Sequence, residues 1–353
     1  MQVDKLRCVN FRNLTEIELY PDKGMNVICG ENAQGKTNII EAIWLFTGAK
    51  SFRGTKDSSF VRFGESAARC ELDFHFEGVE NNAVMDFGER RSATLNEKTL
   101  SAPAGLAGSF KAVVFSPADL SVVCDGPAVR RRFLDIAIGG LNPVYIEVLR
   151  NYTRAVLQRN QIIKDLRYDS TVSVLLDSFE EEIAANGEKL IRMRKEYVEK
   201  LSVFLPDIFS GLSSGREEIM SVYVGKCRDN IIEELKNSRR DDMFTGTTSV
   251  GPHRDDLEFK INGISARNYG SQGQKRSVAL ALKLAQAEVI RDISGEYPVC
   301  LLDDVMSELD PARQNYVLNH IEGMQSFLTC CDPSNTKGLQ NGRIFEVKGG
   351  AVI

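Results

Sequence analysis

Residues 30–37 combine two glycines, a lysine and a threonine at a spacing that suits phosphate binding. The run reads Gly-Glu-Asn-Ala-Gln-Gly-Lys-Thr and fits the pattern G-x-x-x-x-G-K-[ST]. Gly30 and Gly35 allow the backbone to curl, so that successive N–H groups point inward as an anion nest. An expected strand precedes the run and an expected helix follows it, and the helix adds its positive N-terminal end. A glycine turn that matches by accident is the alternative.

The pattern also assigns a role to each polar residue of this loop. We expect Lys36 to reach the β- and γ-phosphates of a nucleotide and to act as a catalytic residue, and the Thr37 hydroxyl to ligate magnesium. The remaining phosphate contacts are expected from the loop residues Glu31, Asn32, Ala33 and Gln34. The expected cofactors are therefore ATP and Mg²⁺.

An apolar strand that ends in two acids is the second candidate feature. Residues 299–302 are Val-Cys-Leu-Leu, and Asp303 and Asp304 follow them. The carboxyl edge of a parallel sheet is where ligands of such sheets collect. We expect Asp303 to hold magnesium through water and Asp304 to polarise an attacking water. Such a strand is common on its own, and its pairing with the glycine loop gives it weight.

Two serine motifs complete the set. The first, Ser271-Gln-Gly273-Gln, precedes an expected helix, and a serine and a glycine at a helix N-terminus make an anion site. Because one nucleotide needs only one cradle, we expect Ser271 and Gly273 to face a nucleotide held by another subunit. An ordinary capped helix is the alternative. The second motif, Ser307-Glu-Leu-Asp310, is an acidic turn that caps the next helix in its plain interpretation.

The elements that position these residues follow from hydrophobic periodicity. Alternation from 67 to about 114 predicts a β-rich layer, and the fold class is α/β. The expected strands are 3–9, 15–19, 25–29, 299–302 and 327–329, and the expected helices are 37–46, 277–290 and 313–321. From 126 to about 240 helical spacing dominates, so we expect a helical lobe, 126–244, inserted between the halves of an α/β lobe, 1–125 and 245–353. Pro206 is expected to end a helix, and 236–242 to form a loop.

Composition limits the class of protein. Of 353 residues 42% are hydrophobic and 26% charged, which is typical of a globular protein, and the net charge is −5. The negative net charge argues against a protein that coats nucleic acid by bulk electrostatics. It does not exclude a local basic groove, because only the charge near the phosphates matters at ordinary salt. The eight cysteines form no CxxC pair, so a reducing compartment is expected. With no signal pattern and no membrane-length apolar run, a cytoplasmic location is expected.

One such groove is predicted in the helical lobe. Between 126 and 170 eight lysines and arginines stand against four acids. If 149–166 is one helix, three of these cations share an arc that can contact phosphates without reading sequence. They are Arg150, Arg154 and Lys164, and the weaker candidates elsewhere are Lys56, Arg62 and Arg69. A solvated helix face is the alternative.

The four motifs together resemble the ABC-type ATPase heads of SMC-type DNA-repair proteins, and more closely the RecF family. Segments similar to that family follow in its order along the chain: 10–13, 35–42, 115–120, 131–135, 251–257 and 301–310. The run Gly251-Pro-His-Arg-Asp-Asp-Leu257 discriminates best, because transporter ATPases lack it.

The resemblance implies an ABC-type P-loop ATPase head with a mixed sheet, helices and a β-rich layer, plus the inserted helical lobe. It also implies an ATP-dependent homodimer in which Ser271 and Gly273 of one copy cap the nucleotide of the other, while Arg12 and Asn13 approach from the β-layer. Proteins of this family bind single-stranded, gapped or junction DNA, hydrolyse ATP slowly, and help load the RecA recombinase with RecO and RecR. The chain is thus expected to act mainly as an ATP-switched DNA-binding factor.

Two positions depart from the ABC pattern. Thr329-Cys-Cys-Asp332 stands where a switch histidine is usual, and 116–119 is only a positional candidate for the Gln loop. Both departures fit a slow hydrolase whose nucleotide acts as a dimerisation switch. His253 is a candidate replacement, with a structural role as the alternative. Two other classes stay open: a metabolic P-loop kinase, which leaves the serine motifs unexplained, and a transporter-type ATPase subunit, which needs a membrane partner.

Overall fold

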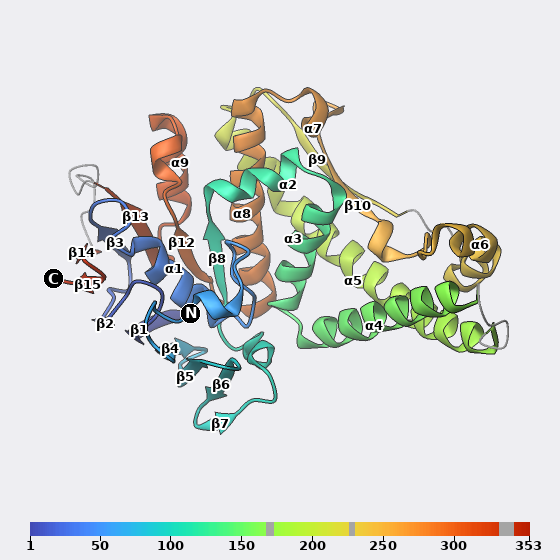
Figure 1. Cartoon of the computed structure of the whole chain (residues 1–353). Helices are drawn as coiled ribbons and strands as arrows, with labels where there is room; N and C mark the ends of the chain where they lie inside the picture. The colour runs from blue at the N-terminus through green and yellow to red at the C-terminus, as the bar shows by residue number, and fades with distance from the viewer. Residues whose placement is uncertain (167–172, 226–229, 332–341) are drawn as a thin grey trace. The chain divides into compact units, whose positions relative to one another are not determined.

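The computed structural model describes residues 1–166, 173–225, 230–331 and 342–353 (Figure 1). The chain divides into two compact units. The first comprises 1–120, 207–217 and 276–353, and the second comprises 121–206 and 218–275. These bounds differ from the expected lobes at 207–217, which lie in the first unit, and at 121–125 and 245–275, which lie in the second. The assignment of an ATPase lobe and a helical lobe stays a prediction.

The first unit contains a mixed six-stranded sheet in the order β15-β14-β3-β13-β12-β8. Neighbours from β14 to β8 are parallel, and only β15 is antiparallel. The strands are β3 (Met25–Cys29), β8 (Ala112–Phe115), β12 (Val299–Leu302), β13 (Ser326–Cys330), β14 (Gly342–Lys348) and β15 (Ala351–Val352). Because β8 and β12 are buried along their whole length, they read as continuous apolar runs. The carboxyl ends of β3, β13 and β12 therefore meet at one edge.

A second sheet of this unit is antiparallel, with the order β2-β1-β4-β5-β6-β7. Its strands are β1 (Gln2–Val9), β2 (Glu16–Leu19), β4 (Ala68–Phe76), β5 (Val79–Phe87), β6 (Ser92–Leu95) and β7 (Lys98–Thr99). Buried and open positions alternate along β4, as expected for a sheet with one face on the core. The predicted β-rich layer is therefore confirmed.

The helices of the first unit continue the same order. Helix α1 (Lys36–Leu45) packs against β8, β12 and β13, and its apolar residues Ile39, Ile40 and Ile43 are fully buried. Helix α9 (Pro311–His320) starts after the acidic turn, and short 3-10 turns lie at Asp57–Ser59, Pro103–Leu106, Pro117–Asp119 and Met306–Glu308. Helix α8 (Gln272–Ser294) begins at the end of the second unit's sequence and continues in the first.

The second unit is mainly helical. Its helices are α2 (Leu120–Cys124), α3 (Pro127–Gly139), α4 (Pro143–Asp165), α5 (Val174–Leu212), α6 (Ile231–Thr245) and α7 (Ala266–Tyr269), with a 3-10 turn at Pro252–Arg254. The first residue of α2 and residues 207–212 of α5 belong to the first unit. A small antiparallel sheet joins β9 (Ile219–Val224), β10 (Asp256–Ile261) and β11 (Ile264–Ser265). None of the helices described is long and apolar enough to span a bilayer.

Two local predictions were wrong. Helix α5 does not end at Pro206 but continues to Leu212, because buried residues on both sides, including Leu205 and Phe209, hold it in place. The charged stretch 236–242 is not a loop but the second half of α6. Its charges are used inside the fold: Asp242 is fully buried and Arg239 pairs with Glu180. Charge alone was therefore a poor guide to solvent exposure here.

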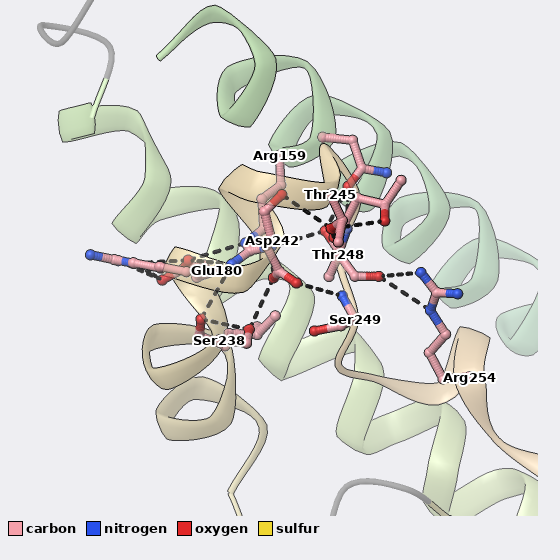
Figure 2. A network of polar contacts seen from close by, with 12 residues as sticks. Arg159, Glu180, Ser238, Asp242, Thr245, Thr248, Ser249 and Arg254 are labelled. Atoms are coloured by element: carbon pink, nitrogen blue, oxygen red, sulfur yellow. Dashed lines mark hydrogen bonds and ion pairs between the residues drawn. The ribbon is translucent and has the colours of Figure 1, made fainter. Parts of the chain in front are cut away.

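A buried ionic network joins α4, α5 and α6 in the second unit (Figure 2). Arg159, Glu180 and Asp242 have no exposed surface. Arg159 Nη1 donates to Asp242 Oδ2 at 2.7 Å, and its Nε donates to Glu180 Oε1 at 3.1 Å. The same Nη1 donates to Thr248 Oγ1 at 3.0 Å, and the Thr248 carbonyl in turn accepts from Arg254 Nη2 at 2.8 Å. The network therefore links three helices to the segment that carries the Gly251–Leu257 motif.

Replacing Arg159 with methionine should strongly destabilise the fold. The change leaves the carboxylates of Glu180 and Asp242 buried without their shared cation, which costs about 3–5 kcal/mol. Urea unfolding at neutral pH measures the loss. Arg154→Met is the matched control on the same helix, since Arg154 is exposed and its ion pair with Glu182 is 3.5 Å long. Similar destabilisation by both changes would contradict a special role of the buried network.

Candidate functional site

The parallel sheet gathers the predicted residues at one edge. Cys29 and Cys330 are register partners on β3 and β13, and Leu328 and Leu302 are partners on β13 and β12. The residues that follow these strands therefore emerge side by side, as ligand-binding residues do in open α/β sheets. The glycine loop, 30–37, and the acidic pair thus share one corner of the first unit.

The loop conformation depends on its glycines. Gly30 has φ +150°, and a Cβ there would lie 2.3 Å from the Val347 carbonyl oxygen. Gly35 has φ +120°, and a Cβ there would lie 2.8 Å from Asn13 Oδ1. Both positions therefore exclude larger residues. Gly35 is also the N-cap of α1, and in this fully described helix no side chain caps the first turn. The free N–H groups there suit an anion.

Lys36 is folded over the loop. Its side chain is largely buried, and Nζ donates to the carbonyl oxygens of Gly30 at 2.6 Å and Glu31 at 2.9 Å. Nζ also lies 3.8 Å from the Cys331 sulfur. The ammonium group is therefore positioned at the loop by main-chain acceptors of the loop itself.

Asp303 joins the acidic strand to the loop. Thr37 Oγ1 donates to Asp303 Oδ1 at 2.8 Å, and Thr329 Oγ1 donates to the same oxygen at 3.2 Å. Burial raises the pKa of Asp303, although these two hydrogen bonds and the charge of Arg53 oppose the rise. A buried carboxylate beside a hydroxyl is a donor set for a hard divalent cation. No cluster of three histidine, cysteine or acidic side chains that could hold a metal occurs among the described residues, so further ligands would have to come from water and phosphate.

Asp304 is held in a strained conformation. Its φ is +54°, a left-handed value that is uncommon outside glycine. Its N–H donates to Thr329 Oγ1 at 2.9 Å, and Ser307 Oγ donates to the Asp304 carbonyl and carboxylate at 2.9 Å and 3.1 Å. Ser307 thus braces the second acid, while Asp310 caps α9 by accepting from Arg313 N at 3.0 Å. The acidic turn therefore both holds Asp304 and starts the next helix.

Asn13 and Arg12 support the loop from the β-layer. Asn13 Nδ2 donates to the Ala33 carbonyl at 3.0 Å, and Asn13 Oδ1 accepts from Asn38 at 2.7 Å. Arg12 pairs instead with Glu41 of α1, with Nε 2.7 Å from Oε2. Asn13 therefore contacts the loop directly, and Arg12 contacts the helix that follows it.

Sequence reasoning missed Arg53 and Glu41. Glu41 is fully buried in α1, and Arg53 lies 3.6 Å from it and donates to Asn38 Oδ1 at 2.9 Å. The positive charge of Arg53 also opposes the rise that burial causes in the pKa of Asp303. A signal for Glu41 existed, because an acid among four apolar neighbours in Ile39-Ile-Glu-Ala-Ile43 needs a buried partner. No comparable signal marked Arg53.

The serine motif at the start of α8 forms a capping box. Ser271 Oγ accepts from Gln274 N at 3.2 Å, and Gln274 Oε1 accepts from Ser271 N at 2.6 Å. This geometry matches the capped-helix interpretation, which is compatible with an anion site at the same helix end. Ser271 and Gly273 lie in the second unit, and their pairing with a second copy stays a prediction.

Hydrogen bonds and an ion pair hold the Gly251–Leu257 motif within the second unit. Tyr152 Oη lies 2.5 Å from His253 Nδ1, and His253 Nε2 lies 3.0 Å from the Thr248 carbonyl. With both ring nitrogens engaged, and with burial lowering the pKa of His253, the structural interpretation of this histidine is favoured. Asp256 makes a fork with Arg130, with oxygens 2.6 Å and 2.9 Å from Nε and Nη2.

The basic residues of the second unit divide into buried and exposed groups. Arg130 and Arg159 are buried in ion pairs and therefore unavailable to phosphates. Arg150 and Lys164 on α4 are exposed, and Arg154 is exposed but paired with Glu182. Arg167 lies outside the described residues. The three cations of the predicted arc are therefore all exposed, and their contact with DNA stays a prediction.

The first unit and its corner define a class of protein. A glycine loop and a buried acid at the edge of a mixed sheet, a β-rich layer and a helical second unit make an ABC-type P-loop ATPase head. The family model of the RecF/RecN/SMC N terminal domain matches residues 2–341, and the chain belongs to the RecF family.

Curated relatives and solved structures agree. DNA replication and repair protein RecF of Clostridium perfringens (strain SM101 / Type A) is 35% identical, over 100% of this chain and 99% of the relative. RecF of Clostridium acetobutylicum is 38% identical, over 98% and 100%. A solved RecF–ATP structure of the RecFOR pathway has a TM-score of 0.91 at 33% identity, over 100% of this chain and 97% of that chain. An Smc head domain from Pyrococcus furiosus shares the fold at TM-score 0.57 and 17% identity, over 99% and 95%.

Gly30→Ala should destabilise the first unit by more than about 2 kcal/mol, since strain at positive φ adds to a backbone clash. Gly54→Ala is the matched control: its φ is +72°, and no atom lies within 4 Å of an added Cβ. The control should cost about 1–2 kcal/mol from φ strain alone. Urea unfolding of both variants measures the difference. Equal losses would show that the close approach of Val347 does not constrain the loop.

Proposed function

We propose that the chain binds Mg²⁺–ATP at the Gly30–Thr37 loop and acts as an ATP-switched DNA-binding protein of recombinational repair and replication-gap processing. The observation that carries this proposal is the 2.8 Å hydrogen bond from Thr37 to Asp303, because it unites the loop and the acidic strand in one site. The family supports it, since its relatives are DNA replication and repair proteins and a solved relative is an ATP complex. Membership of this family also leaves no support for the kinase and transporter alternatives.

The residues of the corner have complementary roles in this proposal. The backbone N–H groups of 30–37 bind the phosphates, and Lys36 turns from the loop carbonyls towards them. Thr37 would hold magnesium directly and Asp303 would hold it through water, and a magnesium ion bound there would supply positive charge for the phosphate oxygens. Asp304, held by Ser307, orients and polarises the attacking water. Asn13 keeps the loop in shape, and Arg12 approaches the nucleotide from the β-layer.

Two copies complete the site. In the proposed homodimer, Ser271 and Gly273 of one copy present the N-terminus of α8 to the phosphates bound by the other. ATP then supplies the contact between copies, and slow, DNA-stimulated hydrolysis releases it. The stretch Thr329-Cys-Cys-Asp332 stands where a switch histidine is usual, which fits slow turnover. The dimer binds DNA without sequence preference and cooperates with RecO and RecR in loading RecA.

Light scattering with and without ATP tests the dimer. In the Asp304→Asn background, which blocks hydrolysis, ATP should convert monomer to dimer. Lys36→Met should abolish both nucleotide binding and dimerisation. Ser271→Arg should bind a fluorescent ATP analogue normally yet stay monomeric, whereas Ser249→Arg, at another exposed serine of the second unit, should still dimerise. A Ser271→Arg protein that dimerises would refute the role of this serine in the partner's site.

DNA affinity in ATP should fall steeply with salt, because phosphate contacts release counterions. Replacing both Arg150 and Lys164 with glutamine should lower the slope of log K against log [salt] by about 2. Fluorescence anisotropy on gapped DNA measures it. The matched control replaces the exposed Lys189 and Lys195 of α5 with glutamine and should leave the slope unchanged. A flat salt response in the unmodified protein would contradict electrostatic binding.

A further inference from the structure

Three cysteines meet at the corner that carries the glycine loop. Cys29 ends β3 and Cys330 ends β13, and the two are direct partners in the parallel register. Cys331 follows at the surface. Register partners project from the same face of a sheet, and neighbouring strands lie about 4.8 Å apart. That spacing falls within the range of Cα separations, about 4.4–6.8 Å, that a disulfide can bridge. Cys29 and Cys330 are thus a cross-strand thiol pair.

This pair adjoins the residues that shape the loop. Cys29 directly precedes Gly30. The Val347 carbonyl leaves no space for a side chain at Gly30, and the Gly30 carbonyl accepts a hydrogen bond from Lys36 Nζ at 2.6 Å. Cys330 directly precedes Cys331, whose sulfur donates to Asn32 Oδ1 at 3.1 Å. A change in the position of either strand end is therefore transmitted to loop residues that we assign to phosphate binding.

The first unit offers a second pair for comparison. Cys8 on β1 and Cys70 on β4 are also register partners, but their exposed fractions are 0% and 1%. Burial raises the pKa of Cys70 well above its usual value, which suppresses the reactive thiolate. Burial also raises the pKa of Cys29, but its partner Cys330 is only half-buried, so a small oxidant can reach the pair at the loop through Cys330 but cannot reach the pair in the β-layer.

We propose that Cys29 and Cys330 form an oxidation-sensitive dithiol that switches off nucleotide binding at the loop. The oxidant is a peroxide. The Cys330 thiol reduces hydrogen peroxide to water and becomes a sulfenic acid; the Cys29 sulfur then attacks it, forming the disulfide and releasing a second water. External thiols reverse the reaction by exchange. The proposal rests on the proposed ATP site, whereas the disulfide itself can be observed independently of it.

The expected effect on the loop follows from disulfide geometry. A disulfide fixes the two Cβ atoms about 3.8 Å apart and imposes its own torsion angles on the two residues, whereas the parallel ladder sets only the backbone spacing of about 4.8 Å. The ends of β3 and β13 must therefore adjust to the geometry of the bond, and Gly30 adjusts with them. Since the loop is packed against Val347 and Asn13 without slack, this shift distorts the anion nest and weakens phosphate binding.

The test treats the full chain with hydrogen peroxide and measures two quantities: disulfides, by peptide mass mapping, and the affinity for a fluorescent ATP analogue. Oxidised protein should contain a Cys29–Cys330 disulfide and bind the analogue at least tenfold more weakly, and dithiothreitol should restore binding. Cys330→Ser should keep full affinity after peroxide. Cys70→Ser, which removes the buried pair, should respond like the unmodified protein. Cys331→Ser removes a thiol that contacts the loop, so its own reduced form is the reference, and oxidation should still weaken its binding at least tenfold.

Each contrary outcome has a distinct meaning. A disulfide that maps to Cys8 and Cys70, an affinity loss that disappears in Cys331→Ser, or a Cys29–Cys330 disulfide with unchanged affinity would each overturn the proposed switch. If the reduced protein did not bind the ATP analogue at all, the proposed nucleotide site would fail instead, and the mapped disulfide would still report on the dithiol.

Discussion

The contact between Thr37 and Asp303 is the interaction on which the site depends. It joins the first turn of α1 to the carboxyl end of β12 across 266 residues of sequence. Burial disfavours the charged form of Asp303, so the carboxylate is stable there only with hydrogen-bond donors or a cation beside it. Thr37 and Thr329 supply those donors.

The parallel sheet makes this contact reachable. Strands β3, β13 and β12 run in the same direction, so the loop, the thiols and the acids all leave the sheet at one edge. Neighbouring side chains hold each of these groups in place. Asn13 donates to the loop, Ser307 donates to Asp304, and Glu41 pairs with Arg12. The strained conformations at Gly30, Gly35 and Asp304 persist because such surroundings hold them in place.

The Gly251–Leu257 motif of the second unit marks the family most clearly. The side chains of this motif make internal contacts with Tyr152, Arg130 and Thr248. The buried network of Arg159 holds the preceding segment. The motif therefore fixes the course of the chain ahead of β10, α7 and the start of α8. In this unit the packing of polar groups against one another accounts for the distinctive sequence.

The sequence by itself determined the loop, the acidic strand and the fold class, because these depend on local patterns: glycine spacing, apolar runs and their ends. It also identified the family through motifs in order. Local patterns failed where partners are distant in sequence. The charged stretch 236–242 looked like a loop although it lies in α6 and Asp242 is buried, Pro206 looked like a helix end, and Arg53 carried no signal at all. Only the tertiary structure decided those, since burial and ion pairing depend on which elements pack together. The register of Cys29 with Cys330 belongs to the same group, because strand pairing is a property of the folded sheet.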